Sequence, residues 1–420
     1  MVGVTVVPAK GTGGLGLIGV AARLLDAATP PERERAVDGL RAAAICGVVL
    51  GHWLVTATVL WGDGGLRVSS PLRALPELAA ATWLFQALTL FFLVGGYVSA
   101  RGLERSRARG DGDRAWLRAR LLRLGRPVLA LAAVWGAAAP ALLAAGVPEA
   151  SVRSALLLVL QPLWFIGVYA AATALSPWLL AAERRAGPAA ALAALLLTAG
   201  VDLLRFGPWG GQVPEWAGFA NLLPAWFFGY LLGISWARGR LRRPLAAALL
   251  AGGAVLLAVL VTRLGYPVSA VGVPGMERSN SNPPSLFVPA LGAVQAGAAV
   301  LLAGPLERLL HRPVAWACAV WPNLNALTVF CWHQTALLAV ALPASALPVP
   351  LPGLTSAPDG AAWLGARLLW LPVLAAVLAA LCAALRRFEP PWTGLPAALP
   401  ARIAAVLAAA ACVGTAAVLL

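Results

Sequence analysis

Three residues near the start of the chain, an aspartate, an arginine and a histidine, are spaced so that one helix face would carry all of them. Arg41 lies eleven positions before His52, and Asp38 lies fourteen positions before it. At ~100° per residue, these spacings bring the three side chains to one side of a helix, where Asp38 and Arg41 could pair. His52 would lie ~16 Å beyond Arg41, so an anion-binding guanidinium would precede an imidazole able to exchange protons.

A second histidine, His333, belongs to the segment Phe330-Cys331-Trp332-His333-Gln334 inside a later apolar stretch. Ionisable groups inside membrane helices are costly unless they face a polar interior, so both histidines are candidate functional residues. Histidines also occur in membrane bundles as packing residues that hydrogen bond to a neighbouring helix. Spacing alone leaves both interpretations open for His52 and for His333.

The chain that must position these residues has the composition of a membrane protein. Of its 420 residues 60% are hydrophobic and only 12% are charged, with a mean hydropathy of +0.81, whereas a soluble domain has roughly 25% charged residues. The net charge of +15 does not indicate nucleic-acid binding, because the arginines form short clusters between apolar segments. The five cysteines lie in apolar runs without paired spacing, so neither disulfides nor a metal site is expected.

Apolar runs of about 20 residues predict an all-α polytopic membrane protein with ten or eleven transmembrane helices. The expected spans lie near residues 40–60, 79–100, 127–146, 162–182, 188–204, 221–237, 244–262, 285–304, 318–342, 362–385 and 399–419. Residues 155–160 could form a re-entrant piece or an early start to the fourth span. Residues 35–420 are expected to form one membrane domain, after a leader at 1–34 that is either flexible or a short amphipathic helix on the membrane surface.

Lysine and arginine are distributed unevenly between the two sides of this arrangement. If the N-terminus is cytoplasmic, 25 of the 32 basic residues face the cytoplasm and 7 face outward. The positive-inside rule therefore predicts a multi-pass protein of the cell membrane with a cytoplasmic N-terminus. Residues 101–126, an expected cytoplasmic loop, contain nine of these arginines. They could anchor the chain to lipid headgroups, attract a polyanionic ligand, or do both.

Several short motifs, in order along the chain, resemble the acyltransferase-3 family of membrane O-acyltransferases. Residues 35–52 match the family's Asp-Gly-x-Arg opening and its Arg-x10-His pattern, through Asp38, Arg41 and His52. The other matches are Phe91-Phe92-Leu93-Val94-Gly95-Gly96-Tyr97, with Gly95 where the family has serine, a basic segment at Arg120 to Pro127 that fits more loosely, Leu163-Trp164-Phe165, and Trp332-His333. The combination is more specific than any one string.

This resemblance implies transfer of an acyl group, usually acetyl, from a cytosolic acyl-CoA such as acetyl-CoA to a hydroxyl of a saccharide, lipid or small-molecule acceptor. His52 would be the catalytic base, and Arg41 would bind or position the acyl-CoA. Asp38 and His333 would support them, and no bound cofactor is expected. Three further arginines could contact the donor's phosphates, although roles in topology explain them equally well: Arg120, Arg123 and Arg126.

The external segment 279–285 is expected to begin the eighth helix, and its Ser281 and Asn282 are candidate acceptor-side residues. Asp202, at the outer end of a span, is expected to be solvated. Two other functions remain open: a transporter or flippase in which Arg41 binds an anionic solute and His52 relays protons, and a non-catalytic scaffold. The alignment of Asp38, Arg41 and His52 on one face disfavours the scaffold. Membrane lipids are expected partners in every case.

Overall fold

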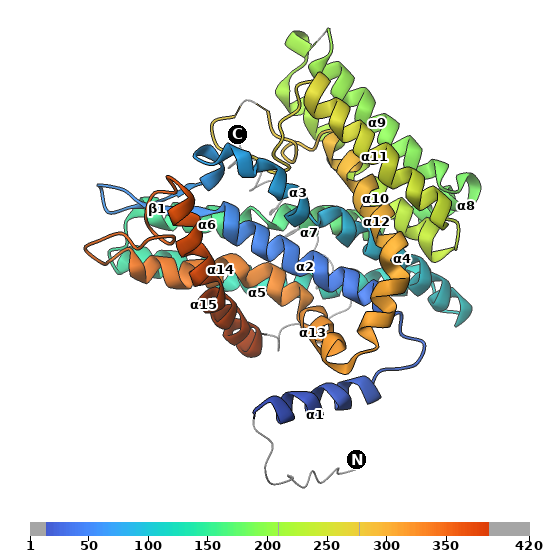
Figure 1. Ribbon diagram of the computed structural model, residues 1–420, viewed down its shortest axis with the longest axis horizontal. Helices are drawn as coiled ribbons and strands as arrows, with labels where there is room; N and C mark the ends of the chain where they lie inside the picture. Colours follow the sequence, from blue (N-terminus) through green and yellow to red (C-terminus); the bar gives the residue numbers. More distant parts are fainter. Residues whose placement is uncertain (1–13, 209, 277, 386–420) are drawn as a thin grey trace.

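The computed structural model describes residues 14–208, 210–276 and 278–385, and these are mostly helical (Figure 1). The helices are α1 (Gly14–Ala27), α2 (Arg35–Val55), α3 (Thr82–Phe85), α4 (Leu88–Ala108), α5 (Asp113–Ala144), α6 (Glu149–Leu160), α7 (Leu163–Ala174), α8 (Ser176–Ala186), α9 (Ala189–Phe206), α10 (Leu222–Ala237), α11 (Arg243–Arg263), α12 (Phe287–Leu310), α13 (Pro313–Leu324), α14 (Ala326–Ala344) and α15 (Ala361–Leu385). Short 3-10 segments precede α3 and α10.

Ten helical segments within the described residues are long and apolar enough to cross a membrane, which confirms the predicted all-α polytopic class. They are Arg35–Val55, Pro76–Ala108, Asp113–Ala144, Glu149–Ala174, Ala189–Phe206, Glu215–Ala237, Arg243–Arg263, Phe287–Leu310, Ala326–Ala344 and Ala361–Leu385. The expected eleventh span, 399–419, lies outside the described residues.

The first span ends earlier than predicted. The chain leaves α2 at Thr56, whose backbone is extended, and the expected helical residues 57–60 instead form strand β1 (Ala57–Leu60). This strand pairs antiparallel with β2 (Leu66–Ser69). Valine and threonine favour a strand, and the glycine-rich turn that follows closes the hairpin. The Leu60 amide donates to the Thr355 carbonyl at 2.8 Å, so the hairpin is also fixed to the loop after α14.

The expected cytoplasmic loop at 101–126 is mostly helical. Helix α4 continues to Ala108 and α5 begins at Asp113, which leaves a connection of only residues 109–112. Gly110 adopts a φ of +82° in this tight connection, a conformation that glycine tolerates without strain. Arg107 closes it with a bidentate pair to Asp113, both N–O distances being 2.7 Å. Arg120, Arg123 and Arg126 therefore project from a helix.

Two other spans are divided differently from the prediction. Residues 155–160 belong to α6, which meets α7 at Pro162, so they are an early start to the fourth span. The predicted span 318–342 is broken at Asn325 into α13 and α14, and only α14 is long enough to cross. The Asn325 side chain donates to the Trp321 carbonyl at 2.9 Å, offering the backbone a local partner that competes with a continuous helix.

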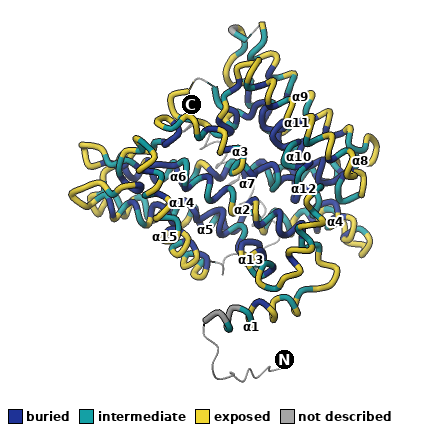
Figure 2. The backbone as a smooth tube through the Cα atoms, viewed as in Figure 1, coloured by how far each residue is buried: buried dark blue, intermediate teal, exposed yellow. Residues whose placement is uncertain are grey.

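Helix α2 runs through the middle of the molecule (Figure 1) and packs against α4, α12, α13 and α14. Figure 2 shows buried residues concentrated along the central helices and exposed residues on the outer faces of α9 and α11. Helices α4 and α10 cross at very short range, because a Cβ added to Gly96 would overlap the Tyr230 carbonyl and one added to Gly233 would overlap that of Leu93. Helix α1, which lies within the expected leader, packs on α13.

The C-terminal end of α2 is capped by Arg367 of α15, which is 0% exposed. Its Nη2 donates to the Thr56 carbonyl at 2.7 Å, and its guanidinium lies 4.8 Å from the centroid of the Trp363 ring. A cation at a helix C-terminus interacts favourably with the helix dipole and pairs a carbonyl that has no partner within the helix. Arg367 thus holds the end of α2 that carries His52.

We expect Arg367→Met to destabilise the protein by about 1.5–3 kcal/mol, the range for a lost hydrogen bond to a charged group. Arg263→Met is the matched control, because Arg263 is an exposed arginine at the end of another span. The melting temperature of the detergent-solubilised protein should fall for Arg367→Met and stay close to wild type for the control. Equal melting temperatures of the two variants would contradict the capping role.

Candidate functional site

Arg41 is held at the N-terminal end of α2 by one carboxylate and one amide. Its Nη2 donates to Asp38 at 2.9 Å, and its Nε donates to the side-chain oxygen of Asn323 from α13. The Asn323 amide in turn donates to the Asp38 carbonyl at 2.7 Å. The Arg41 side chain remains 25% exposed, and no described residue accepts from its Nη1. Arg41 is therefore oriented by the fold yet keeps donors for a ligand.

The same end of α2 is fixed by Glu307 of α12. Its carboxylate accepts from the amides of Arg35 at 3.3 Å and of Ala36 at 2.6 Å. A carboxylate at a helix N-terminus pairs amides that have no partner within the helix and interacts favourably with the helix dipole. Asp38 also accepts from Arg33, so the Arg41 end of α2 is positioned by contacts from three segments of the chain.

The structure brings the two predicted histidines together at the other end of α2. The ring centroids of His52 and His333 lie 4.9 Å apart, and the Trp53 indole donates to the His333 carbonyl at 2.9 Å. The Nδ1 of His333 lies 2.6 Å from the Phe330 carbonyl. A carbonyl can only accept, so Nδ1 carries the hydrogen and Nε2 keeps its lone pair. His333 is 1% exposed, whereas His52 is only partly buried, so His52 is the more accessible imidazole.

Gln334 is a polar partner of His52 that sequence reasoning missed. Its Nε2 lies 3.3 Å from Nδ1 of His52, so Nε2 is the ring nitrogen of His52 left for a substrate. Gln334 is 2% exposed. A buried amide inside an apolar span was the available signal, because polar side chains there need partners on neighbouring helices.

Two of the three candidate donor-binding arginines lie at the Arg41 end. Arg120 and Arg123, like Arg41, lie close enough to Tyr169 of α7 for their positive charges to interact with its hydroxyl group. Arg120 also lies 5.4 Å from the centroid of the Trp116 ring. Arg126 differs, because it is buried at 9% exposure and its Nε has no partner among the described residues. No contact of the described residues joins Arg126 to the other three arginines.

Tyr169 is a second residue that sequence reasoning missed, and its position explains why a glycine stands at position 95, where the family pattern has serine. A Cβ at Gly95 would lie 2.6 Å from Cε2 and 2.8 Å from Oη of Tyr169. The glycine therefore makes room for the tyrosine ring, which also packs against Phe91 and Phe165. The Tyr169 hydroxyl has no hydrogen bond to a described residue, and the side chain is partly exposed. It can therefore donate to a ligand.

The predicted acceptor-side residues do not join this site. The amides of Ser281 and Asn282 donate to Ser279 at 3.3 and 3.1 Å, within their own loop. No contact of the described residues links either of them to His52 or Arg41. Ser285 accepts from the Phe287 amide at 3.3 Å just before α12, whereas the N-cap position itself is Leu286, which makes no side-chain cap.

Asp202 was expected to be solvated, and that expectation was wrong, because it is 2% exposed. It accepts from Asn221 at 2.8 Å, from Tyr266 at 2.9 Å and from the Leu286 amide at 2.6 Å. Burial of the phenol, together with the neighbouring carboxylate, raises the pKa of Tyr266 above its usual range, so the hydroxyl keeps its proton and donates. These donors compensate the burial of the carboxylate and tie the loop before α12 to α9.

A protein-family model described as "Acyltransferase domain", that of the acyltransferase-3 family, matches residues 34–387. The match extends from just before α2 to just beyond α15 and includes every residue of both ends of the site. Comparisons with curated proteins and with solved structures gave no match.

The contact between Gly95 and Tyr169 predicts a specific coupling between the two positions. Gly95→Ala should destabilise the protein by about 1–3 kcal/mol through overpacking, and it should cost much less in a Tyr169→Ala background because the obstructing ring is gone. Gly136→Ala is the matched control, since a Cβ there meets no atom within 4 Å, and it should be neutral or stabilising. Melting temperatures of the four proteins and the control test this, and additive effects would refute the coupling.

Proposed function

The chain belongs to the acyltransferase-3 family, and from that premise we propose that this membrane acyltransferase moves an acetyl group from acetyl-CoA to a hydroxyl of a saccharide, lipid or small-molecule acceptor. The observation that carries the proposal is the pairing of a cationic end and an imidazole end on α2. An acyl-CoA has phosphates at one end and its thioester at the other, joined by an extended arm. Arg41 and His52, ~16 Å apart along the helix, match that division.

The donor's phosphates would bind at the Arg41 end. Arg41, Arg120 and Arg123 supply cationic donors, and the Tyr169 hydroxyl supplies a neutral one. Guanidinium groups suit phosphate because their planar fork can donate two parallel hydrogen bonds. Asp38 engages Arg41 from one side only, so the net charge at this end stays positive.

At the other end, His52 would act as the general base. This role requires the Gln334 amide, whose Nε2 is placed 3.3 Å from Nδ1 of His52, to turn by 180°. Its oxygen then accepts from an Nδ1 hydrogen, and the Nε2 lone pair of His52 is directed to the substrate. Nε2 takes the proton of the acceptor hydroxyl as its oxygen attacks the thioester carbon. The tetrahedral intermediate then collapses, the carbon–sulfur bond breaks, and the imidazolium returns the proton to the CoA thiolate. The ester and CoA leave, and His52 is neutral again.

His333 and Gln334 would position His52 rather than react. His333 is almost fully buried and its Nδ1 hydrogen is committed to the Phe330 carbonyl, while its ring packs against His52. Fixing the orientation and tautomer of a catalytic imidazole through its second nitrogen is the role that a carboxylate plays in serine-protease triads. The family membership favours this enzymatic reading over a transporter or a scaffold. We place the protein in the cell membrane with a cytoplasmic N-terminus, on the distribution of its basic residues.

We expect His52→Ala to lower acetyl transfer by about 10²–10⁴-fold, the usual contribution of a general base. The assay is transfer of labelled acetyl from acetyl-CoA to lipid and glycan extracts, complemented by mass profiling of cells for species lacking one acetyl group. His311→Ala is the matched control, because His311 is exposed at the end of α12. Unchanged transfer in a folded His52→Ala protein would refute the catalytic assignment.

Arg41→Lys should weaken the affinity for CoA by about tenfold, because an ammonium cannot reproduce the planar fork of the guanidinium. Arg33→Lys serves as the control, since Arg33 also pairs with Asp38 but its side chain is 50% exposed. Calorimetric titration of each purified variant with CoA measures the effect. A CoA affinity of Arg41→Lys equal to that of Arg33→Lys would assign Arg41 to helix positioning alone.

A further inference from the structure

A groove of about 390 Å³ lies among four membrane-spanning helices, away from the residues of the histidine and arginine ends. Helix α9 packs on α10, α10 on α12, and α12 on α11. The floor of the groove is therefore formed by α10 and α12, and its walls by α9 and α11, which run alongside each other at the edge of the molecule in Figure 1. Its volume is in the range of ~300–1,000 Å³ typical of small-molecule sites.

The groove is apolar and has the depth of one membrane leaflet. Every lining residue is apolar or glycine, and the rim includes Leu192, which is 50% exposed. Along α11 the lining extends from Leu245 to Leu256, which at 1.5 Å per residue is ~16 Å. That length is about half of a ~30 Å hydrocarbon core. A single lipid acyl chain entering from one membrane surface has this shape and polarity.

Small residues create the space. A Cβ placed on Gly252 would meet no atom within 4 Å, so the groove is open at this point. The adjacent Gly253 is different, because a Cβ there would lie 2.9 Å from the Ala290 carbonyl oxygen and 2.9 Å from the Cβ of Ala293. Gly253 thus allows α11 to pack on α12, while Gly252 leaves room beside that contact.

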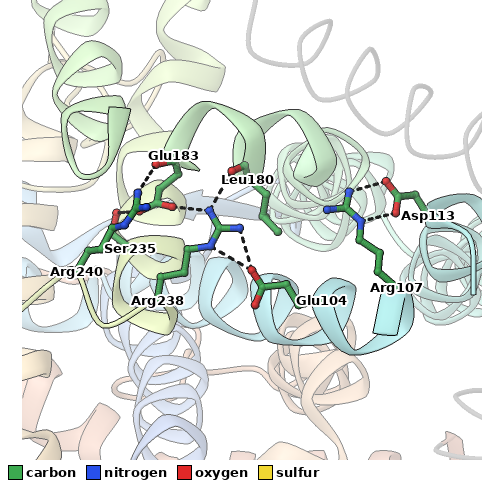
Figure 3. A network of polar contacts seen from close by, with 8 residues as sticks. All are labelled: Glu104, Arg107, Asp113, Leu180, Glu183, Ser235, Arg238 and Arg240. Atoms are coloured by element: carbon green, nitrogen blue, oxygen red, sulfur yellow. Dashed lines mark hydrogen bonds and ion pairs between the residues drawn. The ribbon is translucent and has the colours of Figure 1, made fainter. Parts of the chain in front are cut away.

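The end of the groove where α8 ends and α11 begins is strongly basic. Arg185, Arg242 and Arg243 are exposed there, and none has an ion pair with a described residue. The nearby carboxylate of Glu183 is 0% exposed and fully engaged, as Figure 3 shows, by Arg238 at 2.6 Å and Arg240 at 3.3 Å. Arg238 also engages Glu104 at 2.9 Å. The remaining arginines are therefore available to an anion from outside the chain.

We propose that this groove binds an anionic membrane phospholipid, with one acyl chain between α9 and α11 and its phosphate at Arg242 and Arg243. Apolar lining at membrane depth, one-leaflet length and unpaired arginines at the surface end together match that ligand. A free phosphate would leave the groove empty, and an uncharged lipid would leave the arginines unpaired. The bound chain would fill the space between α9 and α11 and contact both helices.

The test compares phosphatidylglycerol with phosphatidylcholine on the full chain in detergent. Phosphatidylglycerol should raise the melting temperature of the wild type by roughly 5 °C through binding to the folded state, and about one molecule per chain should be retained through purification. Phosphatidylcholine should do neither. Gly252→Leu fills the groove and should abolish both effects, whereas Gly200→Leu, at an equally open position on α9 outside the groove, should preserve them.

Arg242→Gln combined with Arg243→Gln should reduce phosphatidylglycerol retention at least tenfold. Retention that is unchanged in Gly252→Leu would overturn the groove as the binding site. Stabilisation of the wild type by phosphatidylcholine equal to that by phosphatidylglycerol, or a double glutamine variant that retains the lipid fully, would overturn the anionic assignment. Because these readouts are lipid content and the lipid-dependent shift in melting temperature, they are independent of acyl transfer.

Discussion

The hydrogen bonds of Asn323 to Arg41 and to the Asp38 carbonyl are the interaction on which the arrangement of the site depends. Asn323 accepts from the Arg41 guanidinium and donates to the Asp38 carbonyl, so one side chain of α13 fixes both the backbone and the cation of α2. Glu307 pairs the first amides of the same helix, and Arg367 pairs the carbonyl of Thr56, the residue at which the chain leaves it. Helix α2 carries both ends of the site, and polar groups from three other helices therefore fix its position along its axis.

The low polarity of the membrane interior explains why these polar side chains have partners on neighbouring segments. A polar group in hydrocarbon has no water to bond, so a partner within the protein lowers the cost of burying it. His333 uses a carbonyl one helical turn away, and His52 uses Gln334. Asp202 gathers donors from three segments. Some buried polar atoms have no partner among the described residues, including Nε2 of His333, Nε of Arg126, and Nε and Nη1 of Arg367. The Tyr169 hydroxyl is also unpaired within the described part of the chain, and it lies beside the arginines, where a charged ligand would bring its own acceptors.

The sequence predicted what depends on local periodicity and missed what depends on pairing between helices. Apolar runs located the ten spans, and a spacing of eleven residues aligned Arg41 with His52. The strand at 57–60 was missed because apolarity does not distinguish a short strand from the end of a helix. The break at Asn325 depends on a side chain competing with the backbone. Tyr169 and Gln334 were missed because their roles arise from residues on α2 and α4, far away in the chain.

Gly95 and Gly96 show how closely chemistry and packing are linked in this fold. Successive helix positions point about 100° apart, so the two glycines face different neighbours. The space beside Gly95 is filled by Tyr169 of α7, and the space beside Gly96 by the backbone of α10 at Tyr230. A side chain at the first position would displace the hydroxyl at the arginine end, and one at the second would separate α4 from α10. Gly95 carries no side chain, and the Tyr169 phenol from α7 occupies the space beside it. A hydroxyl group is therefore present where the family pattern has a serine, but it comes from a different helix.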